Sequence, residues 1–195
     1  MPIRGRSLGA ASRAFTNHLN RVLATTATQR PLAFEIFKNA GGVGANIRYR
    51  NGSESNAAFI QTTFGPVGLY VGQICDSLVV DNEHILRTLQ YRYMLIPEEH
   101  REPLLRWEYI RFPGEEEVYC RHHVQGPISL NLFDDQNNQV KLSDLRLPTG
   151  WVPVEEVLRF CIVDLGVRPL NPNWDEVLRE SERISRSEFA TMDEL

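Results

Sequence analysis

Hydrophobic residues along the chain follow two spacings, one helical and one typical of strands. Near the N-terminus they recur every three or four positions, at Leu8, Ala11, Phe15, Leu19, Val22 and Leu23. This spacing places them on one stripe of an amphipathic helix. Ser7 is suited to cap the first turn, and the threonine-rich segment 24–29 ends the helix. Residues 1–30 are therefore predicted to form a basic amphipathic helix with most of its arginines facing outward.

Residues 31–125 are predicted to be rich in strands, because apolar and polar residues alternate there. The expected strands before residue 100 are 32–37, 45–50, 57–64, 67–80 and 88–96. The glycine-rich segment 39–44 lies between the first two of them. A phosphate-binding loop would be followed by a helix, and here a strand follows, so we interpret this segment as a hairpin loop.

The next segment, residues 104–125, is predicted to be a hairpin closed by the loop 113–117, which begins Pro-Gly. If the strands pair directly on either side of this loop, Glu108 lies opposite His122. A slip of one residue would exchange the two faces of one strand, and the sequence leaves that alternative open.

Residues 151–187 are predicted to be helical. A first helix begins at Pro153, carries an apolar stripe and ends at Gly166. A second helix begins at Asn173, where an asparagine is followed three residues later by a glutamate. Residues 188–195 are polar and are predicted to be a frayed tail.

The grouping of strands in the middle, with helices at both ends, indicates an α+β fold. We expect a single domain over residues 1–195, consisting mainly of an antiparallel sheet. The N-terminal helix and the two C-terminal helices would pack on that sheet. Strands and helices do not alternate, so the nucleotide crevice of a doubly wound parallel sheet is not expected.

Charge is distributed unevenly along the 195 residues, although the net charge is only −4. Residues 1–52 carry +7, and residues 53–195 carry −11. This balance excludes a protein that is basic all over, but it leaves a basic surface near the N-terminus. That surface either binds a polyanion or attracts the acidic remainder of the chain.

Three scattered cysteines without disulfide or zinc spacing indicate reduced thiols. No apolar stretch reaches the length of about 18 residues that a membrane-spanning helix needs. We therefore expect a cytoplasmic protein with no membrane partner and no cofactor.

Candidate catalytic residues lie in the hairpin of residues 104–125. In the predicted register Glu108 orients the His122 imidazole, which is then suited to act as a general acid or base near neutral pH. His122 and His123 are neighbours on a strand and point to opposite faces, so no metal site is predicted. The alternative interpretation is a polar cross-strand pair on a solvated face of the sheet.

Candidate substrate-binding residues surround this pair. Arg92, Arg106 and Arg121 are suited to hold a phosphate or to stabilise developing negative charge. Tyr109 belongs to a group of aromatic residues that would stack on bases. The alternative for Tyr109 and its neighbours is packing in the core.

Three short motifs follow one another in the chain: Tyr91-Arg92-Tyr93, Arg106-Trp107-Glu108-Tyr109 and His122-His123. Their succession resembles TumE-type toxins of bacterial toxin–antitoxin systems, which have a Tyr-x-Tyr strand, an Arg-Tyr-Asp-like strand and a His-rich segment. Here Trp107-Glu108 stands where that family has Tyr-Asp. The resemblance implies a small toxin that acts on RNA or another cellular polyanion and is neutralised by an antitoxin.

Three hypotheses for the function follow. The first is a protein that acts on or binds a phosphate-bearing polymer or a nucleotide, in its most specific form a metal-independent ribonuclease-like toxin. The second is a non-catalytic module for protein–protein interaction or oligomerisation. The third is a protein that binds a small molecule on the concave face of the sheet. The partner would be RNA or a nucleotide under the first hypothesis, and an antitoxin-like protein or a second copy of the chain under the second.

Overall fold

The order of elements confirms the predicted α+β class. The computed structural model describes residues 3–39, 42–50, 57–97, 102–113, 121–127, 129–133, 139–141 and 146–193. The helices are α1 (Leu8–Thr26), α2 (Val154–Val163) and α3 (Trp174–Asp193). The strands are β1 (Arg4–Gly5), β2 (Leu32–Asn39), β3 (Gly42–Tyr49), β4 (Ala58–Thr62), β5 (Gly65–Val80), β6 (Glu83–Pro97), β7 (Leu105–Ile110), β8 (His122–Gln125), β9 (Ser129–Phe133), β10 (Gln139–Lys141) and β11 (Leu147–Pro148).

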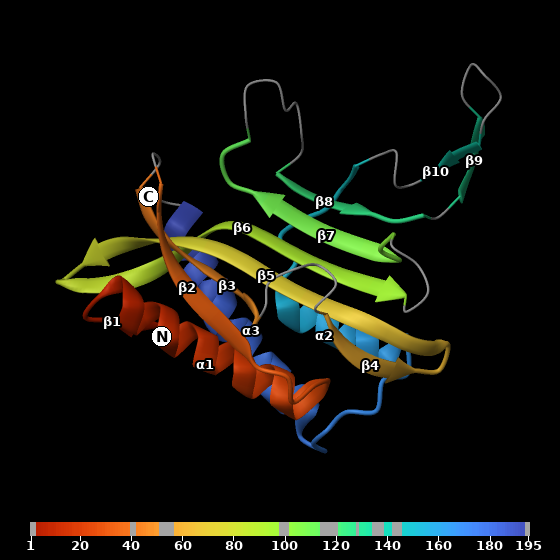
Figure 1. Ribbon diagram of the computed structural model, residues 1–195, viewed down its shortest axis with the longest axis horizontal. Coiled ribbons are helices and arrows are strands. Elements are labelled where there is room, and N and C mark those ends of the chain that lie inside the picture. The colour runs from red at the N-terminus through yellow and green to blue at the C-terminus, as the bar shows by residue number, and fades with distance from the viewer. Residues whose placement is uncertain are drawn as a thin grey trace.

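Nine of these strands form one antiparallel sheet in the order β11-β8-β7-β6-β5-β3-β2, with β1 beside β6 and β4 beside β5 (Figure 1). β5 and β6 are the longest strands and pair with each other from Val67 opposite Pro97 to Val80 opposite Glu83. β9 and β10 form a separate two-stranded sheet. The β5–β6 pair therefore lies in the middle of the main sheet. β1 and β7 pair with β6, β3 and β4 pair with β5, and the remaining strands extend the sheet beyond β7 and β3.

Two hairpins show how local sequence sets the pairing. β2 and β3 pair up to Asn39 opposite Gly42, so the two strands form the predicted hairpin. The predicted loop over residues 39–44 is too long, because residue 39 belongs to β2 and residues 42–44 belong to β3. Between β5 and β6, Asp81 and Asn82 have φ angles of 52° and 62°, a conformation that Asp and Asn tolerate well. Because this turn needs only two residues, β6 begins at Glu83, five positions before the predicted start at residue 88.

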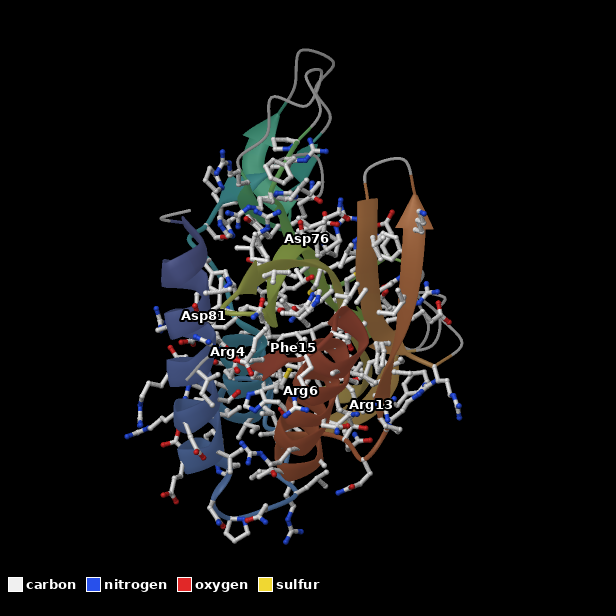
Figure 2. The ribbon with its side chains drawn as sticks, turned by 90° about the vertical axis from the view of Figure 1, so that its left-hand side faces the viewer. Arg4, Arg6, Arg13, Phe15, Asp76 and Asp81 are labelled. Carbon is white, nitrogen blue, oxygen red and sulfur yellow. The ribbon has the colours of Figure 1, made fainter. Side chains whose placement is uncertain are left out.

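α1 confirms the predicted N-terminal helix. Ser7 caps it, since its Oγ accepts a hydrogen bond of 3.2 Å from the backbone N–H of Ala10. The helix lies between α3 and the β2–β3 hairpin, as the view onto it in Figure 2 shows. Its apolar stripe is buried there, while Arg13 and Arg21 are exposed.

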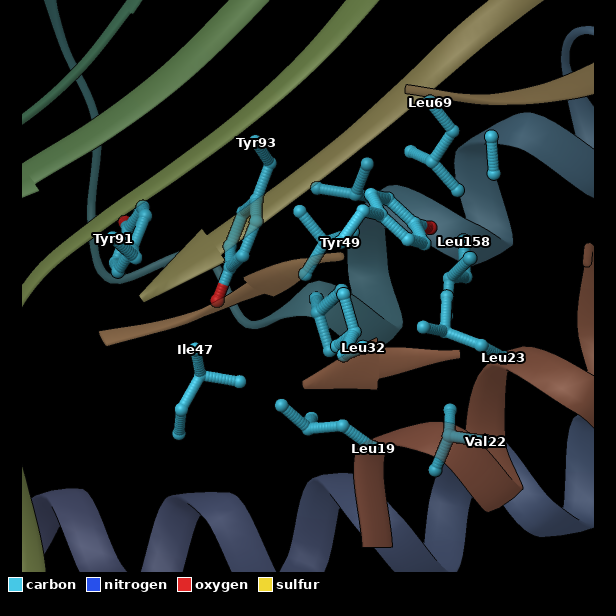
Figure 3. Close-up of a cluster of buried hydrophobic side chains, with 14 of the residues drawn as sticks. Leu19, Val22, Leu23, Leu32, Ile47, Tyr49, Leu69, Tyr91, Tyr93 and Leu158 are labelled. Atoms are coloured by element: carbon cyan, nitrogen blue, oxygen red, sulfur yellow. The ribbon is translucent and has the colours of Figure 1, made fainter. Parts of the chain in front are cut away.

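The core lies between the sheet and the helices, which pack on one face of the sheet that we call the inner face; the opposite face is the outer face (Figure 3). Alternate residues of each strand point to the two faces. In β6, Tyr91, Tyr93 and Leu95 are at most 3% exposed on the inner face. Arg92, between the first two, is exposed on the outer face.

The C-terminal helices begin and end largely as predicted. α2 begins directly after Pro153, and Gly166 follows it with a φ of 69°, the left-handed conformation typical of a helix stop. α3 continues to Asp193, so residues 188–193, which are predicted to belong to a frayed tail, are helical instead. The reason is that residues 174–193 contain no Gly or Pro to interrupt the helix.

Candidate functional site

The pairing of β7 with β8 decides which side chains meet at the predicted site. Glu108 lies opposite His123, and Tyr109 lies opposite His122, so the predicted register is wrong by one residue. Val124 consequently lies opposite Trp107. Glu108 and His122 therefore point to opposite faces of the sheet, and the structure does not form the predicted acid–base pair.

His122 belongs to an aromatic column on the inner face. Its ring stacks on Tyr109 at a centroid distance of 4.4 Å, and Tyr109 in turn stacks on Tyr91 at 5.5 Å. Tyr91 Oη accepts the backbone N–H of Val152 at 3.1 Å and lies 3.2 Å from His122 Nδ1. Burial raises the pKa of Tyr91 to about 12, although the bond from Val152 opposes this. These contacts place His122 as a packing partner of the core.

Tyr109 is only 2% exposed, which corrects the prediction that it contacts a substrate. It packs in the core, as the alternative interpretation holds. Arg121 is exposed next to the start of β8, and its backbone carbonyl accepts the N–H of Ile110 at 3.1 Å. The ion pairs described for Glu108 do not include Arg121.

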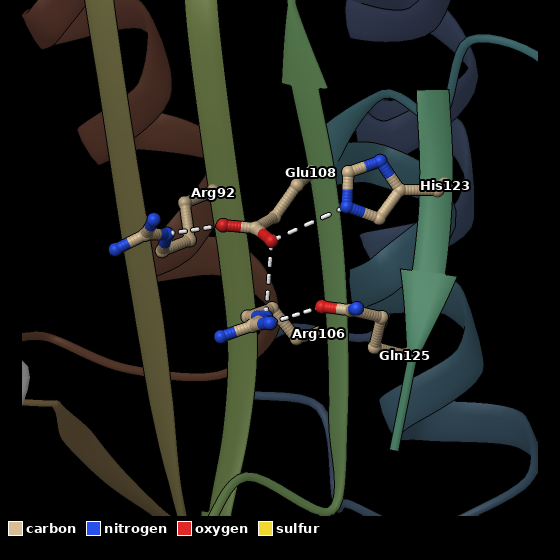
Figure 4. A network of polar contacts seen from close by, with 5 residues as sticks. All are labelled: Arg92, Arg106, Glu108, His123 and Gln125. Carbon is tan, nitrogen blue, oxygen red and sulfur yellow. Dashed lines mark hydrogen bonds and ion pairs between the residues drawn. The ribbon is translucent and has the colours of Figure 1, made fainter. Parts of the chain in front are cut away.

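Glu108 is the centre of a polar cluster on the outer face (Figure 4). Arg92 Nε donates a hydrogen bond of 2.6 Å to Oε1, and Arg106 Nε lies 3.0 Å from Oε2. His123 Nε2 lies 3.4 Å from Oε2, and Arg106 also donates to Gln125. The Glu108 side chain is 12% exposed and that of Arg92 is 48% exposed. A carboxylate shared by two guanidinium groups holds both of them in fixed positions.

The cluster continues into a row of opposed residues across five strands, which we call the central row. It consists of Arg48 on β3, Gly72 on β5, Arg92 on β6, Glu108 on β7 and His123 on β8. Neighbouring strands lie about 4.8 Å apart, so the backbones of Arg48 and Arg92 are separated by about 10 Å. Two long guanidinium-bearing side chains at that separation can contact one ligand.

A hollow of about 220 Å³ lies over the central row, and its lining includes Arg48, Arg92, Tyr70, Asn46 and Gln90. The phenol end of Tyr70 lies over Gly72. A Cβ at residue 72 would stand 2.9 Å from both Cε1 and Oη of that ring. The tyrosine occupies this position because residue 72 has no side chain.

A second polar cluster is buried on the inner face. Ser181 and Ser185 both donate to Oε1 of Glu155, which is 1% exposed. His18 Nε2 lies 2.7 Å from Ser181 Oγ. Because the single hydroxyl proton of Ser181 goes to Glu155, this nitrogen must be the donor. In the part of the chain that is described, Glu155 Oε2 has no hydrogen-bond partner, and the residue borders a cavity of about 40 Å³.

Comparisons with known proteins add no relative: no family model, curated protein or solved structure matches the chain. The resemblance to TumE-type toxins stays a prediction. Within the described ranges, His, Cys, Asp and Glu side chains form no group of three or more that could hold a metal ion. No helix of those ranges is long and apolar enough to cross a membrane.

Proposed function

We propose that the outer face binds a phosphate-bearing ligand through the central row. The observation that carries this proposal is the placement of Arg48 and Arg92 on either side of one hollow, with Arg92 held by Glu108. The planar guanidinium matches the geometry of phosphate oxygens and keeps its charge at all accessible pH values. An oriented guanidinium loses less side-chain entropy when a ligand binds than a mobile one does.

The charge around the hollow favours an anion. Arg48 and Arg92 line the hollow with two positive charges, and Glu108 lines it with one negative charge. The ion pair of Glu35 with Arg48 has an N–O distance of 3.4 Å, and the glutamate side chain is 73% exposed, so it holds Arg48 weakly. A phosphate can therefore displace Glu35 from Arg48 at little cost.

Binding of a short fluorescent single-stranded RNA, followed by anisotropy over a salt series, tests the proposal. Arg92→Gln is expected to weaken binding about 10- to 100-fold, because a hydrogen bond between charged groups contributes about 1.5–3 kcal/mol. Arg48→Gln is also expected to weaken the binding of RNA. The matched control is Arg13→Gln on α1, an exposed arginine away from the outer face, which is expected to leave the affinity within about twofold.

If Arg13→Gln removes binding and Arg92→Gln does not, the anion-binding surface is the basic helix and the proposal is wrong. If the protein binds no phosphate-bearing ligand at all, the first functional hypothesis fails. The alternative of an interaction module, with an antitoxin-like protein or a second copy as partner, then takes its place.

Cleavage of RNA is the finer part of the hypothesis, and the geometry favours binding over cleavage. His123, not His122, is the histidine next to Glu108, but its side chain is only 4% exposed. A labelled RNA incubated with the protein in the presence of a chelator tests metal-independent cleavage directly. Products that disappear in His123→Asn would support a catalytic role for this pair, and intact RNA would limit the function to binding.

A further inference from the structure

The hollow over the central row contains side chains that an anion-binding site does not need. Besides the arginines, its lining contains the ring of Tyr70 and the carboxamides of Asn46 and Gln90. Asn46 and Gln90 belong to the row of opposed residues next to the central row, with Ile74 between them. The arginines and carboxamides therefore lie on two adjacent rows of one sheet face, and the Tyr70 ring extends over Gly72 between Arg48 and Arg92.

From this arrangement we infer that the ligand is a single nucleotide unit, whose base lies against Tyr70 while its phosphate is held by Arg48 and Arg92. This inference rests on the proposed function and names the ligand class of the same site. Bases stack on aromatic side chains, and the carboxamides of Asn and Gln pair with base edges. A simple phosphate or polyphosphate has no base and would not use Tyr70, Asn46 or Gln90.

The size of the hollow supports one unit rather than several. Its volume of about 220 Å³ is below the range of about 300–1,000 Å³ that is common for sites enclosing a whole drug-sized ligand. One ring system fits against the sheet, and the rest of the ligand extends into solvent. The unit is either a free mononucleotide or one residue of an RNA strand, and both present the same base and phosphate.

The position of the Tyr70 ring depends on Gly72. A methyl group at residue 72 would stand at 2.9–3.1 Å from three atoms of the phenol, which is closer than an ordinary carbon contact. Gly72→Ala is therefore expected to move the ring while all the arginines of the site remain. This substitution separates the role of the ring from that of the charges.

Titration calorimetry with AMP and ribose 5-phosphate tests the inference, because the two ligands share the phosphate and the sugar and differ in the base. AMP is expected to bind about 5- to 100-fold more tightly than ribose 5-phosphate to the unaltered protein, the range expected when one base stacks on an aromatic ring. Tyr70→Ala is expected to remove this preference without weakening the binding of ribose 5-phosphate. Tyr70→Phe is expected to keep the preference, and Gly72→Ala to reduce it.

Each outcome bears on one of the two proposals. If both ligands bind equally well to the unaltered protein, the nucleotide inference is wrong and the phosphate site remains. If neither ligand binds, nor RNA, the proposed function itself is wrong. If Tyr70→Ala weakens both ligands equally while circular dichroism shows an intact fold, the ring has only a structural role and the inference is overturned. Titration with a short oligoadenylate distinguishes a free mononucleotide from one residue of an RNA strand. If the natural ligand is an RNA strand, the oligomer should bind more tightly than AMP.

Discussion

Replacing Glu155 with Gln is expected to stabilise the protein at neutral pH and to leave its stability unchanged in acid. Burial raises the pKa of Glu155 from its ordinary value of 4.5, and the hydrogen bonds from Ser181 and Ser185 oppose that shift only in part. The folded state therefore favours the protonated acid. Gln has the same shape, is neutral and can accept the same two serine bonds, so it reproduces the protonated form at every pH.

The expected magnitude follows from the proton balance. With its pKa raised on folding, Glu155 contributes stability that is fully present below the unfolded-state pKa and is lost as pH rises through the folded-state pKa. Between these two values one proton separates the states, so the free energy of unfolding falls by about 1.4 kcal/mol per pH unit. His18 acts in the opposite direction, because burial, assisted by the charge of Arg21, lowers its pKa below 6.5. Its stabilising effect is present above 6.5 and is lost as pH falls.

Urea denaturation of the protein and of Glu155→Gln at a series of pH values between about 4 and 8 measures this dependence. The difference between the two at each pH removes the part of the His18 contribution that both proteins share. The remainder is the effect of Glu155, including its coupling to His18 through Ser181. The free energy of unfolding of the variant should increasingly exceed that of the unaltered protein as pH rises, and the difference should become constant above the folded-state pKa. A difference that stays constant with pH, or a variant that is less stable at neutral pH, would refute the reasoning. The exposed Glu102→Gln serves as control and should change stability by less than about 0.5 kcal/mol.

Three further substitutions test the described contacts. Glu108→Gln is expected to lower the free energy of unfolding by about 1–3 kcal/mol in urea denaturation, because two guanidinium groups lose a charged partner. The control, the exposed Glu35→Gln, should lower it by less than about 1 kcal/mol. Equal losses would contradict the described cluster. Gly166→Ala should cost about 1–2 kcal/mol and lower the Tm in a calorimetric scan, because the residue has a φ of 69°, so an unchanged Tm would argue against that backbone conformation. Leu158 is fully buried in α2, so Leu158→Ala should lower the free energy of unfolding by about 2–5 kcal/mol. Val163 on the same helix is 65% exposed, so Val163→Ala should change it by less than about 0.5 kcal/mol. Similar values for the two variants would show that α2 does not pack as described.

The elements of the fold were predictable where their signals are local. Ser7, Pro153 and Gly166 act on the backbone within a few residues of themselves, and the structure places each at the helix boundary expected of it. The predicted start of β6 at residue 88 is five positions too late, because residues 81–84 interrupt the alternation of apolar and polar positions. Asp81 and Asn82 tolerate the left-handed conformation and form a two-residue turn instead.

The predicted register of β7 and β8 is wrong, although the sequence contains a signal for the observed one. The predicted register puts Val124 opposite Arg106, an apolar residue facing a charge. The observed register puts Val124 opposite Trp107 and leaves Gln125 opposite Arg106, so apolar residues share one face and polar residues the other. Matching both strands by polarity, rather than counting outward from the loop, selects the observed pairing.

The site was only partly predictable. Arg92, Arg106 and Glu108 were identified as candidates, and they meet on the outer face. The sequence alone does not point to Arg48 and Tyr70, because they reach the hollow only through the pairing of β3 with β5 and of β5 with β6. Pairing between strands so far apart in the chain leaves no pattern in the sequence near either residue.

The two-residue turn between β5 and β6 also has a kinetic consequence. Pairs close to this turn join residues that are near neighbours in the chain, so little loop entropy is lost when they form. The hairpin is thus suited to nucleate folding, with β3 and β7 adding to its two sides and the C-terminal helices docking later. A substitution such as Asn82→Val should then slow refolding more than it accelerates unfolding, whereas Leu158→Ala should mainly accelerate unfolding.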